Sequence, residues 1–168
     1  MIFLVLKIFG SVLVVAASFA IGCKLSHNLH RRRDFLKAFV TFISSLATSI
    51  RYSSADIFTL VNSCTGDDNL SFLLLNENDL DSFDTAWKNK IDNIPKAISL
   101  TKSDRQLLYE FGSQLGKTDI EGQLKHLELY KITFAKQLSS AEDAITQKSK
   151  LYKTMGFFAG TAAALMMI

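Results

Sequence analysis

Residues Thr118–Lys150 read TDIEGQLKHLELYKITFAKQLSSAEDAITQKSK. Thr118 and Glu121 have the spacing of a capping box, which is typical of a helix start. Apolar side chains then recur at steps of three or four, the period of one helix face; they are Ile120, Leu124, Leu127, Tyr130, Phe134, Leu138, Ala141 and Ile145. The stretch predicts one long helix whose apolar stripe packs into a core, and any length beyond that core would offer a surface to a partner.

A second stripe of the same period lies nearer the start of the chain, at Phe35, Phe39, Phe42, Ile43, Leu46 and Ile50. We expect it to be the antiparallel partner of the long helix. Pro95 is the only proline in the chain, so long helices can run without interruption. These patterns predict an all-α fold, a helical bundle.

Shorter helices are expected between the two stripes. Ser53 and Asp56 have capping-box spacing and predict a helix that ends near Gly66. The sequence SFLLL, at 71–75, fits either a short strand or a helical turn. The acidic run NENDLDSFD, at 76–84, lacks the glycine and the closing glutamate of a calcium loop, so it is expected to be a solvated loop.

Two further helices are predicted before the long one. The first covers about 82–94, with Phe83, Trp87 and Ile91 on one face, and stops at the proline. The second has capping-box spacing at Ser103 and Gln106, and it ends at Gly116, which suits the left-handed closing position. Its apolar stripe is formed by Leu107, Leu108, Phe111 and Leu115.

The N-terminal end is apolar over residues 2–22, which read IFLVLKIFGSVLVVAASFAIG with Lys7 as the one charge. A helix of this length spans roughly 30 Å, the thickness of a bilayer's hydrocarbon core. We therefore predict a transmembrane helix at 1–23. A cleaved signal peptide is the rival interpretation, but its positive charge normally precedes the apolar run. A lipoprotein site at Cys23 is a second rival, disfavoured by the basic residues that follow.

The C-terminal end, residues 151–168, reads LYKTMGFFAGTAAALMMI and predicts a short membrane helix. Gly156, Gly160 and Ala164 form a row of small residues that permits close helix packing in lipid, with the N-terminal helix as the expected mate. The alternative is a buried C-terminal core helix.

Basic residues flank both apolar ends on the side of the middle domain: Lys24, Arg31, Arg32, Arg33, Lys37, Lys148, Lys150 and Lys153. The positive-inside rule therefore predicts that residues 24–150 form a cytoplasmic domain and that the two ends make a membrane hairpin. The same residues can contact anionic lipid headgroups. Cys23 and Cys64 lack the spacing of a disulfide framework or a zinc site, which fits a reducing compartment.

No catalytic motif is present: the sequence has no phosphate-binding loop, no dinucleotide glycine pattern and no nucleophile elbow. His27 and His30 could reach one metal ion, but their basic surroundings favour headgroup contact. His126 is expected to be a polar helix residue or a partner contact. The basic cluster lacks interleaved aromatic residues, which disfavours nucleic-acid binding. We expect no enzyme activity, no cofactor and no metal.

The stretch LLYEFGSQLGKTDIEGQLKHLELY, residues 107–130, resembles the stage III sporulation protein AB family of endospore-forming bacteria. The shared positions are Phe111, Gly112, Leu115, Gly116, Asp119 and Gln123. The segment SSLATSIRYSSADIF, at 44–58, also looks like the family, although it lacks the proline that often follows its serine. The layout of apolar ends around a helical domain is similar over nearly the whole chain.

The resemblance implies a structural component of a channel complex that links the mother cell to the engulfed forespore. It implies a domain similar to the helical cytoplasmic domain of the type II secretion inner-membrane platform protein. By that analogy the chain would lie in the mother-cell membrane around the forespore, face the cytoplasm, and dock the complex's ATPase, stage III sporulation protein AA. The alternative is a membrane-bound adaptor or regulator unrelated to transport. Fold analogy alone does not determine function.

The shared positions also have a physical interpretation of their own. Gly112 would permit close helix contact, and Gly116 would end its helix. Asp119 would lie at the positive end of the long helix, where a carboxylate is favourable. Gln123, one turn on, could hydrogen-bond back to the loop. This corner is therefore expected to be structural first, and as an exposed turn it could also be a partner contact.

Overall fold

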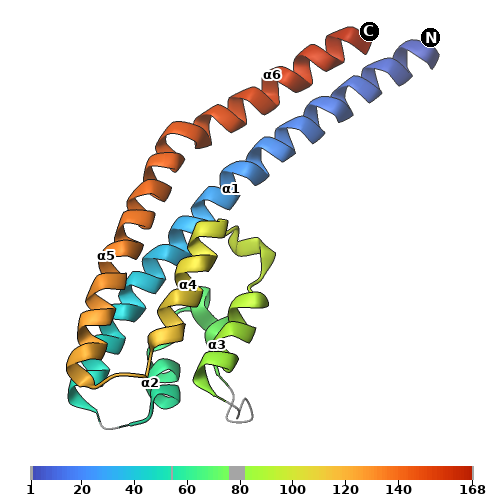
Figure 1. Cartoon of the computed structure of the whole chain (residues 1–168). Helices are drawn as coiled ribbons and strands as arrows, with labels where there is room; N and C mark the ends of the chain where they lie inside the picture. Colours follow the sequence, from blue (N-terminus) through green and yellow to red (C-terminus); the bar gives the residue numbers. More distant parts are fainter. Residues whose placement is uncertain (1, 54, 76–81, 168) are drawn as a thin grey trace. The chain divides into compact units, whose positions relative to one another are not determined.

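The structure is a computed structural model that describes the backbone of residues 2–53, 55–75 and 82–167. Within the helices, the side chains of 2–9, 11, 14, 149, 153, 156–157, 160 and 163–167 lie outside the description. The described residues form helices and connecting turns, with no strand among them, which confirms the all-α prediction (Figure 1). The α-helices are α1 (Ile2–Tyr52), α2 (Ile57–Cys64), α3 (Phe83–Asp92), α4 (Lys102–Gln114), α5 (Ile120–Ala144) and α6 (Lys150–Met167).

Three short segments of other helix types complete the chain. Two are 3₁₀ helices, η1 (Asp68–Leu73) and η2 (Lys96–Ile98), and the third is a π-helical segment, η3 (Ile145–Ser149). The SFLLL sequence therefore lies largely in a 3₁₀ turn rather than a strand. Of the predicted acidic loop, residues 76–81 lie outside the described part, and Ser82 caps α3 through its side chain.

The chain divides into two compact units, Met1–Arg31 with Ala141–Ile168, and Arg32–Ser140. We call them the terminal unit and the central unit. Helix α1 contributes to both of them. The membrane boundaries at 23 and 150 stay predictions, because a division by contacts within the chain does not test where a membrane would begin.

The core of the central unit is a cluster of aromatic side chains from four helices. Phe39 of α1 lies at its centre, with ring centroids 4.6 Å from Phe134 of α5 and 5.3 Å from Phe111 of α4. Trp87 of α3 packs 5.7 Å from Phe111 and donates its indole N–H to the carbonyl oxygen of Leu108 at 2.8 Å. The two predicted stripes thus meet in one core, because their helical period brings these rings to the same faces.

The helix starts differ from the predicted capping boxes. In α2 the cap is Asp56, whose carboxylate accepts from the Thr59 backbone N–H at 3.0 Å, whereas the Ser53 hydroxyl accepts from the Ala55 N–H before the helix begins. In α4 the predicted pair Ser103 and Gln106 is wrong. The capping box is instead Thr101 with Asp104, so the helix begins earlier than expected.

The start of α5 is also shifted from the prediction. Thr118 does not cap it as expected; instead the Asp119 carboxylate accepts from the Gly122 backbone N–H at 3.0 Å. Several serines, threonines and aspartates lie near each helix start, and which of them has extended backbone geometry is decided by packing. The helices were therefore predictable, but their first residues were not.

The terminal unit consists of the first part of α1 together with η3 and α6 (Figure 1). The long helix predicted to run to about Lys150 is divided in the structure: α5 ends at Ala144, and the π-helical segment Ile145–Ser149 connects it to α6. Within the described residues, we find no helix that is both long and apolar enough to cross a membrane.

Candidate functional site

The corner between α4 and α5 contains the six positions of the sequence motif. Gly116 has φ +79°, which confirms the left-handed closing position predicted for it. Gly112 faces Trp87 so closely that an added Cβ would lie 2.0 Å from the ring atom Cδ1. Its predicted role in close helix contact is therefore confirmed, and the missing side chain leaves the space that the indole fills.

Gln123 binds back to the turn before its helix, as the sequence predicts. Its amide Nε2 donates to Thr118 Oγ1 at 3.0 Å and to the Gln114 carbonyl oxygen at 3.4 Å. The residue is 5% exposed. Its other amide atom, Oε1, is buried and has no hydrogen-bond partner within the described part of the chain. An unpaired buried acceptor costs folding free energy.

The motif positions differ in what they offer to a partner. Phe111, Gly112 and Leu115 are buried in the central unit, and Gln123 is nearly so. Gly116 and Asp119 are exposed. The four buried residues stabilise the conformation of the corner, and a partner can contact the corner at its outer surface.

A hollow of about 230 Å³ lies on that outer surface, and we call it the corner hollow. It is formed mainly by Ile50, Ile57, Leu60, Gly116, Ile120 and Gln123. The sequence motif pointed to Gly116 and Gln123. The apolar residues from α1 and α2 were missed, because only the fold brings them to the corner.

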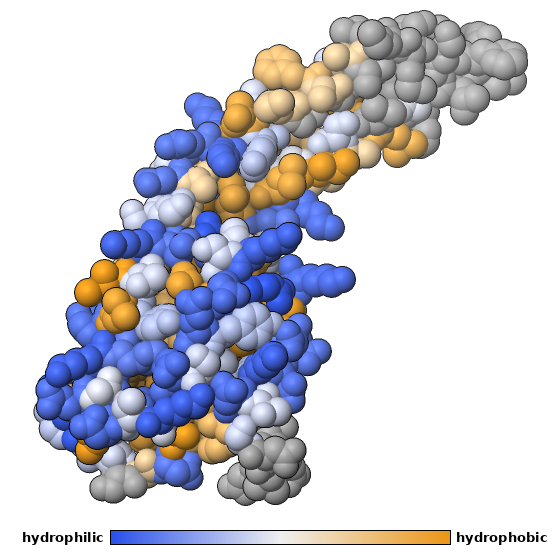
Figure 2. All heavy atoms as spheres, viewed as in Figure 1, coloured by the Kyte–Doolittle hydropathy of each residue, from blue (hydrophilic) through white to orange (hydrophobic). Residues whose placement is uncertain are grey.

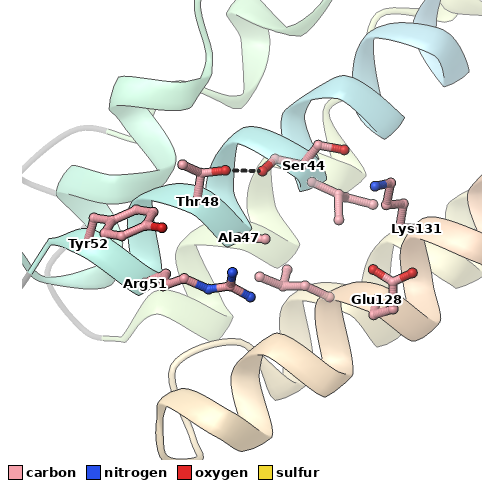
Figure 3. A pocket seen from close by; sticks show the side chains of 9 residues that line it. Ser44, Ala47, Thr48, Arg51, Tyr52, Glu128 and Lys131 are labelled. Carbon is pink, nitrogen blue, oxygen red and sulfur yellow. Dashed lines mark hydrogen bonds between the residues drawn. The ribbon is translucent and has the colours of Figure 1, made fainter.

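A second hollow, of about 280 Å³, lies between α1 and α5. In Figure 3 Arg51 extends from α1 toward α5, where Glu128 and Lys131 lie. Thr48 lines the α1 side and donates its hydroxyl to the Ser44 carbonyl oxygen at 3.1 Å. Its lining is more polar than that of the corner hollow and carries charges of both signs.

A third hollow, of about 310 Å³, lies between α3 and α4 beside Trp87 and Tyr109. Small-molecule pockets are usually about 300–1,000 Å³. The three hollows are at or below the lower end of that range. Among the described residues there is also no group of three or more side chains suited to hold a metal ion.

Arg32 differs from the other basic residues predicted to face a membrane. Its guanidinium is 12% exposed and donates from Nε to Oδ2 of Asp104 at 2.7 Å, and Nη2 also donates to Gln137 Oε1 at 3.1 Å. Burial by itself raises the pKa of the Asp104 carboxyl, but hydrogen bonds from Arg32 and Thr101 outweigh it and hold this pKa below its ordinary value of 3.8. Arg32 is thus paired inside the central unit, and no pattern in the sequence predicts this partner.

The remaining basic residues predicted at the membrane surface have diverse surroundings. In the terminal unit Lys24, Arg31, Lys148 and Lys150 are exposed. Arg31 also donates from Nε to His27 Nε2 at 3.2 Å. The Lys153 side chain lies outside the described residues, as do those of Gly156, Gly160 and Ala164 in the predicted packing row.

Two further basic residues of that group belong to the central unit. Arg33 is paired with the neighbouring Asp34 at 2.7 Å, and Lys37 is exposed. His126, the predicted polar or partner residue, stacks on Phe111 and bonds through Nε2 to its carbonyl oxygen at 3.0 Å. This histidine is therefore part of the corner's packing.

The terminal unit exposes large apolar side chains on both of its helices: Val12, Leu13, Phe19, Ile21 and Leu25 on α1, and Leu151, Met155 and Phe158 on α6. Figure 2 shows apolar side chains gathered on the described surface of this unit. Ile21 is 62% exposed and Phe158 65%. These values argue against the alternative of a buried C-terminal core helix. Contiguous exposed apolar surface marks an interaction site for protein or membrane.

Fold and surface together define a small all-helical protein with an aromatic core and apolar terminal helices. The family model described as stage III sporulation protein AB matches residues 7–168. The chain belongs to this family, which confirms the resemblance seen in its sequence and supports a role in sporulation. A similar protein is stage III sporulation protein AB of Bacillus subtilis (strain 168), which is 26% identical over 170 residues, covering 97% of this chain and 99% of the relative. No solved structure matches the chain.

Proposed function

We propose that this protein is a non-enzymatic structural component of the channel complex between mother cell and forespore, which docks a secretion-type ATPase at the membrane. The observation that carries the proposal is the match of residues 7–168 to the stage III sporulation protein AB family. The proposed place is the mother-cell membrane around the forespore. The proposed partners are membrane lipid, other sporulation channel proteins and the ATPase, stage III sporulation protein AA.

The membrane part of the proposal is supported by the chain's two ends. Residues 2–22 are apolar apart from Lys7, and the described side chains of the terminal unit expose aliphatic and aromatic groups. Lys24, Arg31, Lys148 and Lys150 follow or precede these apolar stretches and are exposed. A basic residue near an anionic surface contributes about 1 kcal/mol. Both ends are therefore proposed to insert from the cytoplasmic face, with Arg32 removed from the lipid-facing group.

The docking part is supported by the central unit, which has its own core and carries hollows of a size suited to side chains. Its likeness to the secretion platform domain is implied by the family resemblance, and fold likeness alone does not establish function. A direct binding test therefore decides it. The full chain, purified in detergent, should retain the purified stage III sporulation protein AA ATPase of the same organism. Absence of binding would favour the alternative of an adaptor unrelated to transport.

The orientation can be tested with a single engineered cysteine. In a Cys23→Ser, Cys64→Ser background, a Lys117→Cys variant places one thiol on the exposed turn before α5. A membrane-impermeant thiol reagent should label it only after the cells are permeabilised. Labelling in intact cells would contradict a cytoplasmic central unit.

A further inference from the structure

The hollow of about 280 Å³ between α1 and α5, which we call the α1–α5 hollow, has a cation from each of the two helices in its lining (Figure 3). Arg51 comes from α1 and Lys131 from α5. The α1 wall is otherwise made of small side chains, Ser44, Ala47 and Thr48. The two hydroxyls of this wall donate to carbonyl oxygens of their own helix, at 3.0 and 3.1 Å, so neither requires a partner from outside.

The two cations have no ion partner within the described part of the chain. The ion pairs found there belong to three other basic residues. Glu128 lines the same hollow and precedes Lys131 by three residues, a helical spacing at which opposite charges can pair, but these two do not. The Arg51 guanidinium makes no hydrogen bond to another described residue either. Two cations and one carboxylate give the lining an excess of one positive charge.

A single carboxylate is the anion that matches this lining. The planar guanidinium of Arg51 presents paired N–H donors whose spacing fits the two oxygens of a carboxylate, and the Lys131 ammonium can donate to the same group. A phosphate monoester carries up to about two negative charges near neutral pH, which exceeds the excess in the lining. It would also be repelled by Glu128, and like charges brought together weaken binding.

The rim of the α1–α5 hollow favours a protein as the source of that carboxylate. Tyr52 lines the hollow and is 80% exposed. A free organic acid would leave this ring in water, whereas a protein segment that reaches the hollow also covers it, so that apolar area leaves water. Tyrosine and arginine are both enriched at protein interfaces relative to the remaining surface.

We propose that the α1–α5 hollow docks an acidic segment of a partner protein, whose aspartate or glutamate carboxylate lies between Arg51 and Lys131. The inference goes beyond the proposed function, because it states the chemistry of a partner and holds whether or not that partner is the ATPase.

The other two hollows offer no comparable selection by charge. The corner hollow has no charged side chain in its lining. The hollow between α3 and α4 is lined by one residue of each sign, Asp84 and Lys88, so its charges cancel. Among the three, the α1–α5 hollow is the one whose lining favours an anion.

The test measures how a fluorescent peptide of glutamate and alanine binds to the full chain in non-ionic detergent, by anisotropy at low salt. Arg51→Gln and Lys131→Gln should each weaken binding roughly threefold, and the double variant roughly tenfold, as for exposed ion pairs. The control is the double variant Lys117→Gln, Lys136→Gln, which removes the same charge from exposed positions outside the hollow and should bind normally. Equal losses in both double variants would show that the peptide follows net charge, and would overturn the proposal.

A substitution of the opposite sign makes the test sharper. Glu128→Gln removes the one carboxylate from the hollow and should tighten binding of the acidic peptide roughly threefold. Glu142→Gln removes the same charge from another exposed position of α5 and should leave binding unchanged. Weaker or unaltered binding by Glu128→Gln would overturn the proposal.

Two further measurements identify other occupants. A fluorescent single-stranded DNA oligonucleotide should not distinguish the two double variants; a loss confined to the Arg51, Lys131 variant would indicate a phosphate site and overturn the carboxylate. Light scattering should give the same mass for all variants, and a dimer lost only in that variant would identify a second copy of this chain as the occupant and overturn the proposal. Thermal unfolding followed by circular dichroism should be the same for every variant, and the single variants provide the comparison if a double variant does not fold.

Discussion

At the scale of single residues, Gly112 is the position where the core has least room. Replacing Gly112 with alanine would place a Cβ 2.0 Å from Trp87 Cδ1, and Trp87 is only 1% exposed. The indole must then shift, which strains its hydrogen bond to the Leu108 carbonyl oxygen. We expect Gly112→Ala to lower the free energy of unfolding by about 1–3 kcal/mol. Denaturant unfolding of the full chain in mild detergent measures this.

Gly66→Ala is the matched control for that substitution. A Cβ at Gly66 meets no atom within 4 Å, and its backbone lies outside the positive-φ region. The free energy of unfolding should therefore change by less than about 0.5 kcal/mol. Equal effects at Gly66 and Gly112 would show that Trp87 does not fill the space beside Gly112.

Asp104 is the residue whose charge connects distant parts of the central unit. Its carboxylate is fully buried, accepts from the Thr101 backbone N–H in the capping box of α4, and pairs with Arg32 of α1. Because its pKa is lowered in the folded state, the stability it contributes is complete above the ordinary value of 3.8 and is lost as the pH falls through the folded value. At pH 7 Asp104→Asn leaves Arg32 partly buried without its anion, so it should cost about 3 kcal/mol.

The pH dependence of this loss can be measured by unfolding both chains in denaturant from pH 7 downward. The difference between wild type and Asp104→Asn should stay constant above about pH 4 and shrink below it, as the wild-type carboxylate takes up its proton. Asp34→Asn is the control, because its ion pair with Arg33 is about one-third exposed and contributes little. A difference that stayed unchanged at low pH would mean that the ion pair does not carry the effect.

At the scale of secondary-structure elements, the predicted and the observed caps of α4 are different residues. The Thr101 hydroxyl accepts from the Asp104 backbone N–H at 3.1 Å, whereas Ser103 is exposed and lies inside the first turn. Thr101→Ala should lower the free energy of unfolding by about 1 kcal/mol, and Ser103→Ala should leave it nearly unchanged. Thermal unfolding followed by circular dichroism measures both variants. The reverse order would restore the cap that the sequence suggested.

Helix faces were predictable from this sequence because they repeat, and a repeat is a local property. The stripes through Phe39 and Phe134 are each visible over several turns, and both entered the core as expected. Single contacts were not predictable. Arg32 reads as one more basic residue beside the membrane, and only the fold brings Asp104 to it across 72 positions. The π-helical segment at Ile145–Ser149 had no signal in the apolar pattern either.

The candidate site was predictable in the same partial way. A glycine in the left-handed region and a helix-capping aspartate have local signatures, so Gly116 and Asp119 could be assigned to the corner from the sequence. The corner hollow could not be assigned, because Ile50 and Ile57 come from another part of the chain. That Gln123 Oε1 lacks a partner could not be predicted either, because it depends on the hydrogen bonds that the amide makes in the folded chain.

At the scale of the whole molecule, the division into two units separates folding from membrane attachment. All of the described buried apolar side chains except Ala141 lie within the central unit, Arg32–Ser140. A compact unit with its own core can fold alone. The exposed apolar side chains of the terminal unit have no such core to enter, and a bilayer or a partner protein would cover them.

A fragment limited to residues 32–140 tests that separation. It should be helical by circular dichroism and unfold in one cooperative transition, because the aromatic cluster around Phe39 is retained in full. It should remain in the supernatant when vesicles of anionic phospholipid are sedimented, whereas the full chain should sediment with them. The fragment lacks the apolar ends and also Lys24, Arg31, Lys148 and Lys150, so it keeps little of the predicted lipid affinity beyond Lys37. Equal sedimentation of fragment and full chain would place the lipid contact on the central unit and contradict the proposed anchoring by the ends.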